Sequence, residues 1–329
     1  MRQTSAMKQE ALVRHRGGLN RPTPSAEAPP VARRDVAFDS HGVTCRAWAY
    51  APAAGVTHPA PCIVMAHGLG GTRTCALEPY AKAFAAAGFF VLLFDYRYLG
   101  ASGGTPRQLI EIRSELQDWA AAIAFARTIL GVDPRRIALW GTSLSGGYVF
   151  TAAAKDAGVA AIAAQCPMLD GKASARMLAQ DAGLATIVRL GWAALVDVAR
   201  SLIGKSPKYL PLVAPPGKLA AMSSHDAYDG MRAIVPPSWR NEVAARLFLI
   251  LPCYRPTRSA KSIRCPALVI ACEKDSVTST QAAVATAARM GRRARLVELP
   301  IGHFDIYLGE WFERSSQEQI AFFKEALRS

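Results

Sequence analysis

The feature that most constrains the fold of this chain is the stretch at residues 137–147, which reads IALWGTSLSGG. Its first four residues are continuously apolar, which indicates a buried strand of a parallel sheet. The run ends abruptly in small residues, and the following YVFTAAA has the apolar spacing of a helix. The stretch therefore predicts a strand that turns sharply into a helix.

Ser143 lies at the predicted turn, between Gly141 and Ser145. A turn this tight strains the backbone of its central residue and leaves no space for bulky residues two positions away, a condition that both neighbours satisfy. The free N–H groups that begin the helix point back at the turn, where they can stabilise a negative charge. Ser143 is therefore predicted to be a nucleophile.

The same stretch permits a second register, SLSGG, in which Ser145 is the central serine. Strand phasing favours Ser143, because the apolar run stops at Trp140 and Ser145 then falls in the first helical turn. The motif alone leaves open a third interpretation, in which the serines belong to a glycine-rich turn without chemistry.

Strands alternate with helices along the rest of the chain. This pattern indicates a doubly wound, mostly parallel α/β sheet that begins with an antiparallel hairpin at 35–51. Further strands are expected at 61–66, 89–96, 159–170, 267–272 and 294–300, with helices at 76–88, 107–130, 278–290 and from 311 onward. The predicted parts are a disordered basic tail at 1–34, a core at 35–170 and 262–329, and a helical cap at 171–261, inserted after the sixth core strand.

Binding sites in open α/β sheets gather at the carboxyl ends of the strands, so the histidines near such ends are the candidate bases. Only His67 and His303 follow a core strand closely. His67 lies in a glycine-rich loop before the serine, where a histidine more often braces the loop. His303 follows the last strand, and the chain order serine, acid, histidine fits this architecture. His303 is therefore the predicted base.

Two carboxylates compete to orient His303. A buried acid has to accept the Nδ1–H of the imidazole to fix its tautomer. Asp275, just after the seventh strand, is favoured over Asp170, which is expected to cap the start of the insertion. Asp95 is interpreted as a structural turn residue, and Asp305 as a neighbour of the histidine that points elsewhere.

Five segments together resemble an α/β-hydrolase, within the broad group of serine esterases, dienelactone-hydrolase-like enzymes and prolyl-peptidase-like enzymes. They are HGLGGTR at 67–73, FDYRYLGASGG at 94–104, WGTSLSGG at 140–147, the turn at Asp275, and GHFDIY at 302–307. The resemblance covers residues 35–170 and 262–329. It implies a helical cap and an oxyanion hole formed by the backbone N–H groups of Leu69 and Leu144. His67 and Gly68 of the same loop are candidate substrate contacts.

The cap contains two apolar segments, at 184–204 and 245–254, that exceed what a surface cover needs. Part of this surface has to pack on the core. The remainder could line an acyl pocket over Ser143, because ligand sites are mostly apolar. Trp192 and Leu195 are the candidate lining residues. The alternative, that all of this apolar surface packs against other parts of the protein and lines no pocket, stays open.

The net charge of +14 is concentrated in the tail and in residues 171–261, where 13 basic and 5 acidic residues give +8. No basic run is interleaved with aromatic residues, so no nucleic-acid partner is expected.

Arg189, Asp197 and Arg200 interrupt the most apolar piece too often for a membrane span. No metal-ligand spacing appears, so neither a metal nor another cofactor is predicted. The seven cysteines show no paired spacing, which suits a reducing cytoplasm.

These features predict a serine hydrolase that cleaves a carboxylic ester of a small-molecule substrate through an acyl-enzyme. Thioester hydrolysis, acyl transfer, and amide or C–C hydrolysis use the same residues and stay open. A non-catalytic binding protein on this fold is a further alternative, although such proteins usually lose a triad residue and this chain has a candidate for each. The sequence leaves a homo-oligomer open.

Overall fold

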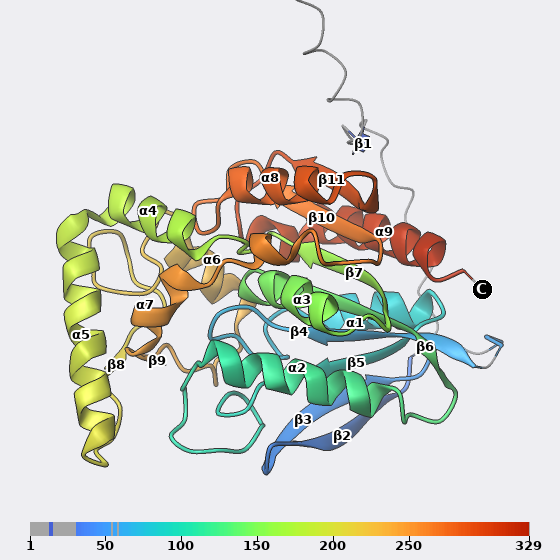
Figure 1. Ribbon diagram of the computed structural model, residues 1–329, viewed down its shortest axis with the longest axis horizontal. Coiled ribbons are helices and arrows are strands. Elements are labelled where there is room, and N and C mark those ends of the chain that lie inside the picture. Colours follow the sequence, from blue (N-terminus) through green and yellow to red (C-terminus); the bar gives the residue numbers. More distant parts are fainter. Residues whose placement is uncertain (1–12, 16–30, 54, 58, 329) are drawn as a thin grey trace, which may run out of the picture.

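The computed structural model describes residues 13–15, 31–53, 55–57 and 59–328, and their strands form one large sheet (Figure 1). Its order is β1-β11-β10-β7-β6-β4-β5-β3-β2. The bounds are β1 (Val13–His15), β2 (Arg33–Ser40), β3 (Val43–Tyr50), β4 (Ala60–Ala66), β5 (Phe90–Phe94), β6 (Val132–Thr142), β7 (Val159–Gln165), β10 (Ala267–Cys272) and β11 (Ala294–Leu299).

The pairing is antiparallel within the β2–β3 hairpin and between β3 and β5, and all other neighbours in the sheet are parallel. The predicted fold class is therefore confirmed. Three residues of the predicted tail, Val13–His15, form β1 and pair with β11. Most of the rest of that tail lies outside the described residues.

Helices cover both faces of the sheet because successive side chains of each buried strand point to opposite faces. In β4, Val64 belongs to the cluster that packs under α2 (Ile112–Ala126), α3 (Leu144–Lys155) and α8 (Thr280–Met290). Its neighbour Met65 packs under α1 (Glu78–Ala86) and α9 (Gly309–Ala326) on the other face. The near-continuous apolar strands in the sequence reflect this burial on both sides.

The segment between β7 and β10 holds the predicted helical insertion, which follows the sixth core strand counted from β2. It contains α4 (Gly171–Ala182), α5 (Leu184–Leu202), β8 (Tyr209–Leu210), α6 (Ala227–Ile234), β9 (Val243–Ala244) and α7 (Leu247–Ile250). In Figure 1, α5 stands across the left end of the molecule, beyond the sheet. We call residues 171–261 the cap.

A buried carboxylate holds the cap together. Asp197 of α5 is fully buried and forms an ion pair with Arg246, 2.8 Å from Nε. It also accepts hydrogen bonds from the backbone N–H groups of Lys208 and Arg246. Burial alone would raise the pKa of Asp197, but these partners hold it below its ordinary value. The charged residue in this apolar helix therefore joins α5 to the segments of the cap that carry Lys208 and Arg246.

Two contacts join the cap to the loop after β4. The indole N–H of Trp239 donates to the carbonyl of Gly70 at 2.8 Å, and Leu212 packs directly on Gly70. Gly70 has a φ of +61°, which residues with a side chain rarely adopt, and a β-carbon there would lie 2.3 Å from Leu212, so the loop favours a glycine at this contact. The cap therefore rests on the glycine-rich loop that the sequence placed at the site.

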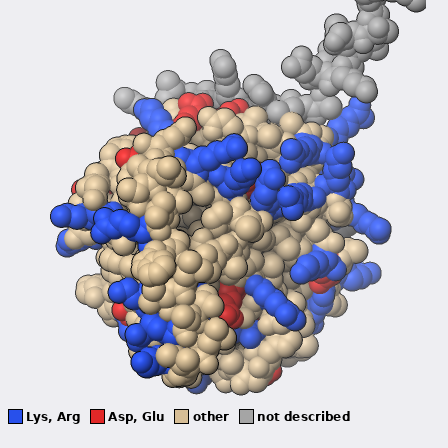
Figure 2. All heavy atoms as spheres, turned by 60° about the vertical axis from the view of Figure 1, so that its left-hand side comes forward, with Lys and Arg blue, Asp and Glu red and all other residues tan. Residues whose placement is uncertain are grey.

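Figure 2 turns the side of α5 toward the viewer and shows Lys and Arg side chains around this face, with uncharged residues between them. None of the lysine and arginine residues of the cap is buried, so its excess positive charge lies at the surface. None of the described helices is both long and apolar enough to cross a membrane.

Candidate active site

Ser143 lies where β6 ends and α3 begins, with φ 55° and ψ −121°. This strained backbone is held by hydrogen bonds on both sides of the turn, from its N–H to the Gln165 carbonyl and to its carbonyl from the N–H of Met168. A β-carbon at Gly141 would lie 2.2 Å from the carbonyl oxygen of Ser145. The sequence folds into the sharp turn because this position has no side chain.

His303 and Asp275 lie beside this serine. The Nε2 atom of His303 is 3.2 Å from Ser143 Oγ, and its Nδ1 is 2.7 Å from Asp275 Oδ2. Asp275 also accepts hydrogen bonds from the N–H groups of Val277 and Thr278 and from the Thr278 hydroxyl. The carboxylate is therefore locked in place, and the three predicted residues form one hydrogen-bonded line.

The electrostatics of this line favour a charged imidazole. Burial alone would lower the pKa of His303, but the charge of Asp275 and the hydrogen bond to it raise the pKa well above its ordinary value. The ring is 3% exposed, so water competes little with this interaction. A proton taken from Ser143 would be held on a ring that Asp275 stabilises.

The alternatives for the nucleophile and the acid lie elsewhere. Ser145 Oγ is fully buried and lies 2.8 Å from the hydroxyl of Tyr96, away from His303. Asp170 accepts hydrogen bonds from two N–H groups of α4 and forms an ion pair with Arg255 at 2.7 Å. Asp170 thus caps the start of the insertion, as expected.

Asp95 and Asp305 hold turns. Asp95 accepts hydrogen bonds from the N–H groups of Arg73 and Ala101, at 2.7 and 3.0 Å. Asp305 accepts the N–H of Gly302 at 2.8 Å and so shapes the turn that carries His303. Both roles agree with the interpretation from the sequence.

The loop after β4 approaches the nucleophile from the other side. A β-carbon at Gly68 would lie only 2.8 Å from the Cβ of Ser143, so this glycine allows the loop backbone to reach the serine. Neither the N–H of Leu69 nor that of Leu144 has a hydrogen-bond partner in the described part of the chain. Leu144 is the first residue of α3, where N–H groups are free by geometry.

His67 is buried under this loop. Its Nδ1–H donates to the Gly68 carbonyl at 3.0 Å, and its Nε2 lies 3.9 Å from Asp95, with no hydrogen-bond partner among the described residues. Burial lowers the pKa of His67, so the ring is neutral. Its edge packs on the Tyr96 ring at 4.8 Å between centroids. The ring therefore braces the loop.

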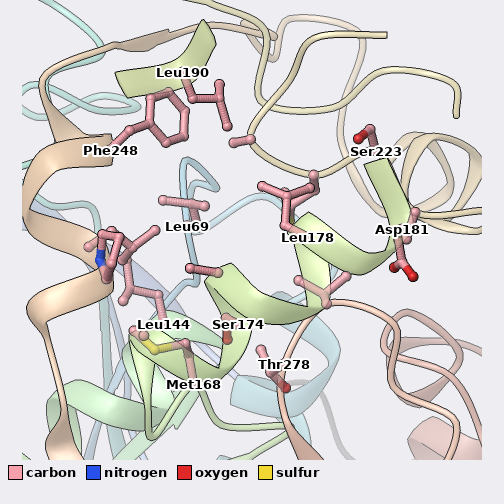
Figure 3. A pocket seen from close by; sticks show the side chains of 18 of the residues that line it. Leu69, Leu144, Met168, Ser174, Leu178, Asp181, Leu190, Ser223, Phe248 and Thr278 are labelled. Atoms are coloured by element: carbon pink, nitrogen blue, oxygen red, sulfur yellow. The ribbon is translucent and has the colours of Figure 1, made fainter. Parts of the chain in front are cut away.

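Two cavities meet at Ser143. The larger has a volume of about 200 Å³ and is walled mostly by apolar side chains of the core loops and of the cap (Figure 3). The smaller has a volume of about 30 Å³ and lies beside His303, with His67 and Gly68 in its wall. The apolar wall of the larger cavity includes Leu69, Leu144, Met168, Leu178, Ile187, Leu190, Phe248 and Val277.

The predicted cap contacts need correction. Trp192 is 69% exposed and Leu195 is 54% exposed, and neither lines a cavity that reaches Ser143. The residues of α5 that do line the larger cavity are Ile187, Leu190 and Gly191. Apolar residues lie on all sides of α5. The two residues that the sequence analysis assigned to the cavity lie on the side of the helix that faces solvent.

The sequence interpretation also missed the wall that α4 supplies. Gly171, Ser174 and Leu178 line the larger cavity. They are spaced by three and four residues, so they share one face of the helix. This spacing, directly after the carboxyl end of a core strand, is a signal that could have identified them.

A family model described as the alpha/beta hydrolase family matches residues 63–314. The chain is 43% identical over 297 residues to the quorum-quenching protein AidA of Acinetobacter baumannii, which covers 90% of this chain and 95% of that protein. It is 28% identical over 277 residues to the thiohydrolase aneE of Aspergillus aculeatus, with 81% of this chain and 86% of that protein covered.

Among solved structures, the alpha/beta hydrolase GrgF of Penicillium superposes with a TM-score of 0.76 at 27% identity. The superposition covers 90% of this chain and 99% of GrgF. The likeness therefore includes the cap as well as the sheet.

Proposed function

This chain belongs to the alpha/beta hydrolase family and is an enzyme, and we propose that it hydrolyses carboxylic esters through an acyl-enzyme formed on Ser143. The observation that carries the proposal is the line from Ser143 through His303 to Asp275, with spacings of 3.2 and 2.7 Å. A strained serine at the end of a buried strand, with a base and an orienting acid in reach, is the arrangement that activates a hydroxyl nucleophile.

In the proposed reaction, Ser143 Oγ attacks the ester carbonyl while His303 Nε2 takes its proton. Asp275 holds the Nδ1–H and stabilises the imidazolium that forms. The N–H groups of Leu69 and Leu144 receive the oxyanion, an interaction typically worth about 3 kcal/mol per donor. His303 then gives its proton to the leaving alcohol, and a water activated by the same ring releases the acid.

The two cavities suggest where the halves of the substrate bind. The larger, apolar cavity suits the acyl chain, and the smaller cavity beside His303 suits the leaving group, which receives a proton from that ring. In this proposal the cap of residues 171–261 sets acyl preference, and the core of residues 35–170 and 262–329 supplies the chemistry.

A second candidate is thioester hydrolysis, because a relative at 28% identity over most of the chain is named a thiohydrolase. The same residues serve both reactions, and a thiolate leaves without needing a proton. Thioester turnover should therefore tolerate loss of proton donation by His303 better than ester turnover does.

The test compares Ser143→Ala with the matched variant Ser145→Ala on p-nitrophenyl esters and on acyl thioesters of equal chain length. Ser143→Ala should remove turnover of whichever bond the enzyme cleaves, and Ser145→Ala should retain most of it. Turnover that survives in Ser143→Ala and disappears in Ser145→Ala would overturn the proposal. A wild-type preference for thioesters at every chain length would favour the second candidate.

A further inference from the structure

Two serine hydroxyls that belong to the wall of the larger cavity have no hydrogen-bond partner in the described part of the chain. Ser174 on α4 and Ser223, in the segment before α6, both line this cavity. The Oγ atoms of both are buried, and neither has a hydrogen-bond partner within the described ranges. Ser223 as a whole is only 3% exposed. Figure 3 shows both side chains among the apolar residues of the wall.

The other hydroxyls along the same wall are satisfied. Ser224 donates to Asp226 at 3.0 Å and lies 2.9 Å from the hydroxyl of Ser276. Thr278 donates to Asp275 at 2.8 Å. These partners come from the protein itself, so their hydroxyls need nothing from a ligand. Ser174 and Ser223 differ from them because their hydroxyls have no partner among the described residues.

A buried hydroxyl without a partner costs about 1–3 kcal/mol. An acyl chain that enters the cavity also keeps water away from both hydroxyls. A plain hydrocarbon chain would then leave both hydroxyls unpaired. A chain that carries its own oxygen would pair with them.

We propose that the preferred acyl group of this enzyme carries one or more hydroxyl or keto oxygens along its chain, beyond the scissile carbonyl, and that Ser174 and Ser223 each offer a hydroxyl to such an oxygen. The inference rests on the proposed function, since it takes the larger cavity as the acyl site next to Ser143. At about 200 Å³, the cavity far exceeds the roughly 10–15 Å³ that one water needs on this measure, so a chain of several carbons fits.

The neighbouring charge indicates that this oxygen is uncharged. Asp181 also lines the cavity, and in Figure 3 it lies next to Ser223, across from Leu69 and Phe248. Asp181 is exposed, so solvent weakens its field, but a carboxylate on the acyl chain would still meet a like charge there. The positive charge of the cap therefore does not make the cavity itself a site for acidic chains.

The test uses octanoyl esters of one alcohol, with the chain unsubstituted, with a hydroxyl or keto group moved along it, or with a terminal carboxylate. For at least one position of the oxygen, wild-type kcat/KM should exceed that for the unsubstituted chain by about tenfold or more, which is the equivalent of about 1.4 kcal/mol. Ser223→Ala and Ser174→Ala should each reduce this ratio several-fold, mainly by improving turnover of the plain chain. The carboxylate should be the poorest substrate.

A matched control is Ser201→Ala, because the hydroxyl of Ser201 already donates to Val198 within α5 and lies outside the cavity wall. It should leave the ratio unchanged. A ratio near one at every position, or one that Ser223→Ala and Ser174→Ala leave intact, would overturn the inference while ester hydrolysis itself stands.

A binding measurement separates this inference from the proposed function. Calorimetry on Ser143→Ala compares octanoic acid with octanoic acids that carry a hydroxyl at each position in turn, and does not depend on turnover. Tighter binding of at least one hydroxylated acid, weakened by a further Ser223→Ala substitution, would support the inference even if wild type cleaved no ester. Equal binding of octanoic acid and every hydroxylated acid would contradict it.

Discussion

At the scale of single residues, the charge on His303 decides how this site responds to pH. The ring has to be neutral to take a proton from Ser143. Asp275 lies 2.7 Å from Nδ1 and raises the pKa of His303 above its ordinary value of 6.5, against the opposite effect of burial. The acidic limb of the rate profile should therefore be centred above pH 6.5.

Replacing Asp275 tests this coupling. Asp275→Asn should lower kcat/KM by roughly 10⁴-fold, because the amide favours the wrong tautomer of the imidazole. It should also move the midpoint of the acidic limb to lower pH, since the charge that raises the pKa of His303 is gone. The measurement is kcat/KM for an ester between pH 5 and 9.

Asp170→Asn is the matched control, because Asp170 also follows a core strand but caps α4 and pairs with Arg255. This substitution should lower kcat/KM by less than about tenfold and leave the midpoint of the acidic limb unchanged. Comparable losses in both variants would reopen the assignment of the acid.

The three site residues could be predicted because each follows a strand end within a few positions, so local sequence fixes where it lies. Ser143 needs only the small residues around it, and the glycine at 141 is explained by the 2.2 Å contact that a side chain would make. The contact residues of the cap depend on packing between distant segments. For these residues the sequence indicated which segment contributes to the site but not which of its side chains face the cavity.

At the scale of elements, α5 is where prediction from the sequence went wrong. In an amphipathic helix the charged residues are expected to mark the solvent face. Asp197 breaks that rule, since it is fully buried and paired with Arg246 from a segment 49 residues away. Its partner cannot be identified from the helix alone. As a result, Trp192 and Leu195 lie outside, and Leu190 lies inside.

The corrected orientation of α5 predicts which residues control acyl preference. Ile187→Ala widens the larger cavity, so it should raise kcat/KM for long acyl chains relative to acetate by several-fold or more. Trp192→Ala removes an exposed side chain of the same helix and should leave the ranking of chain lengths unchanged. The measurement is kcat/KM across p-nitrophenyl esters of two to twelve carbons. If Trp192→Ala changed the ranking of chain lengths and Ile187→Ala did not, the acyl chain would have to bind along the outer face of α5.

At the scale of the whole molecule, a buried carboxyl links α2 to α3. Glu115 is 3% exposed and accepts a hydrogen bond from the Tyr148 hydroxyl at 2.7 Å. Burial, with the charge of Asp118, raises its pKa from 4.5 to about 8, although the Tyr148 bond acts in the opposite direction. The folded protein therefore keeps this group protonated at a pH where the unfolded chain releases the proton.

The sign of the stability effect follows from this difference. The stabilisation from the bound proton is fully present below pH 4.5 and is lost as the pH rises toward 8, at up to about 1.4 kcal/mol per pH unit. Glu115→Gln cannot ionise, so its unfolding free energy should depend less on pH. Urea unfolding of both proteins at pH 5 to 8.5 measures the difference. A constant offset between them over this range would show that Glu115 does not titrate there.

The mostly parallel sheet, its antiparallel hairpin and the inserted cap were predictable from the sequence, because alternating strands and helices have few ways to close on one sheet. The cavity walls were not, because α4, the segment before α6 and the loop after β10 meet only in the folded chain. Ser174 and Ser223 lie 49 positions apart and share a cavity through the path of the cap alone.

The central claim is that Ser143 is the nucleophile of an acyl-enzyme, and covalent labelling tests it most directly. Wild-type protein is treated with a fluorophosphonate and digested, and the modified peptide is sequenced by mass spectrometry. We predict one adduct, on Ser143, that is absent from Ser143→Ala and also from His303→Ala, because the serine needs its base. An adduct on Ser145, or equal labelling of wild type and Ser143→Ala, would contradict the claim.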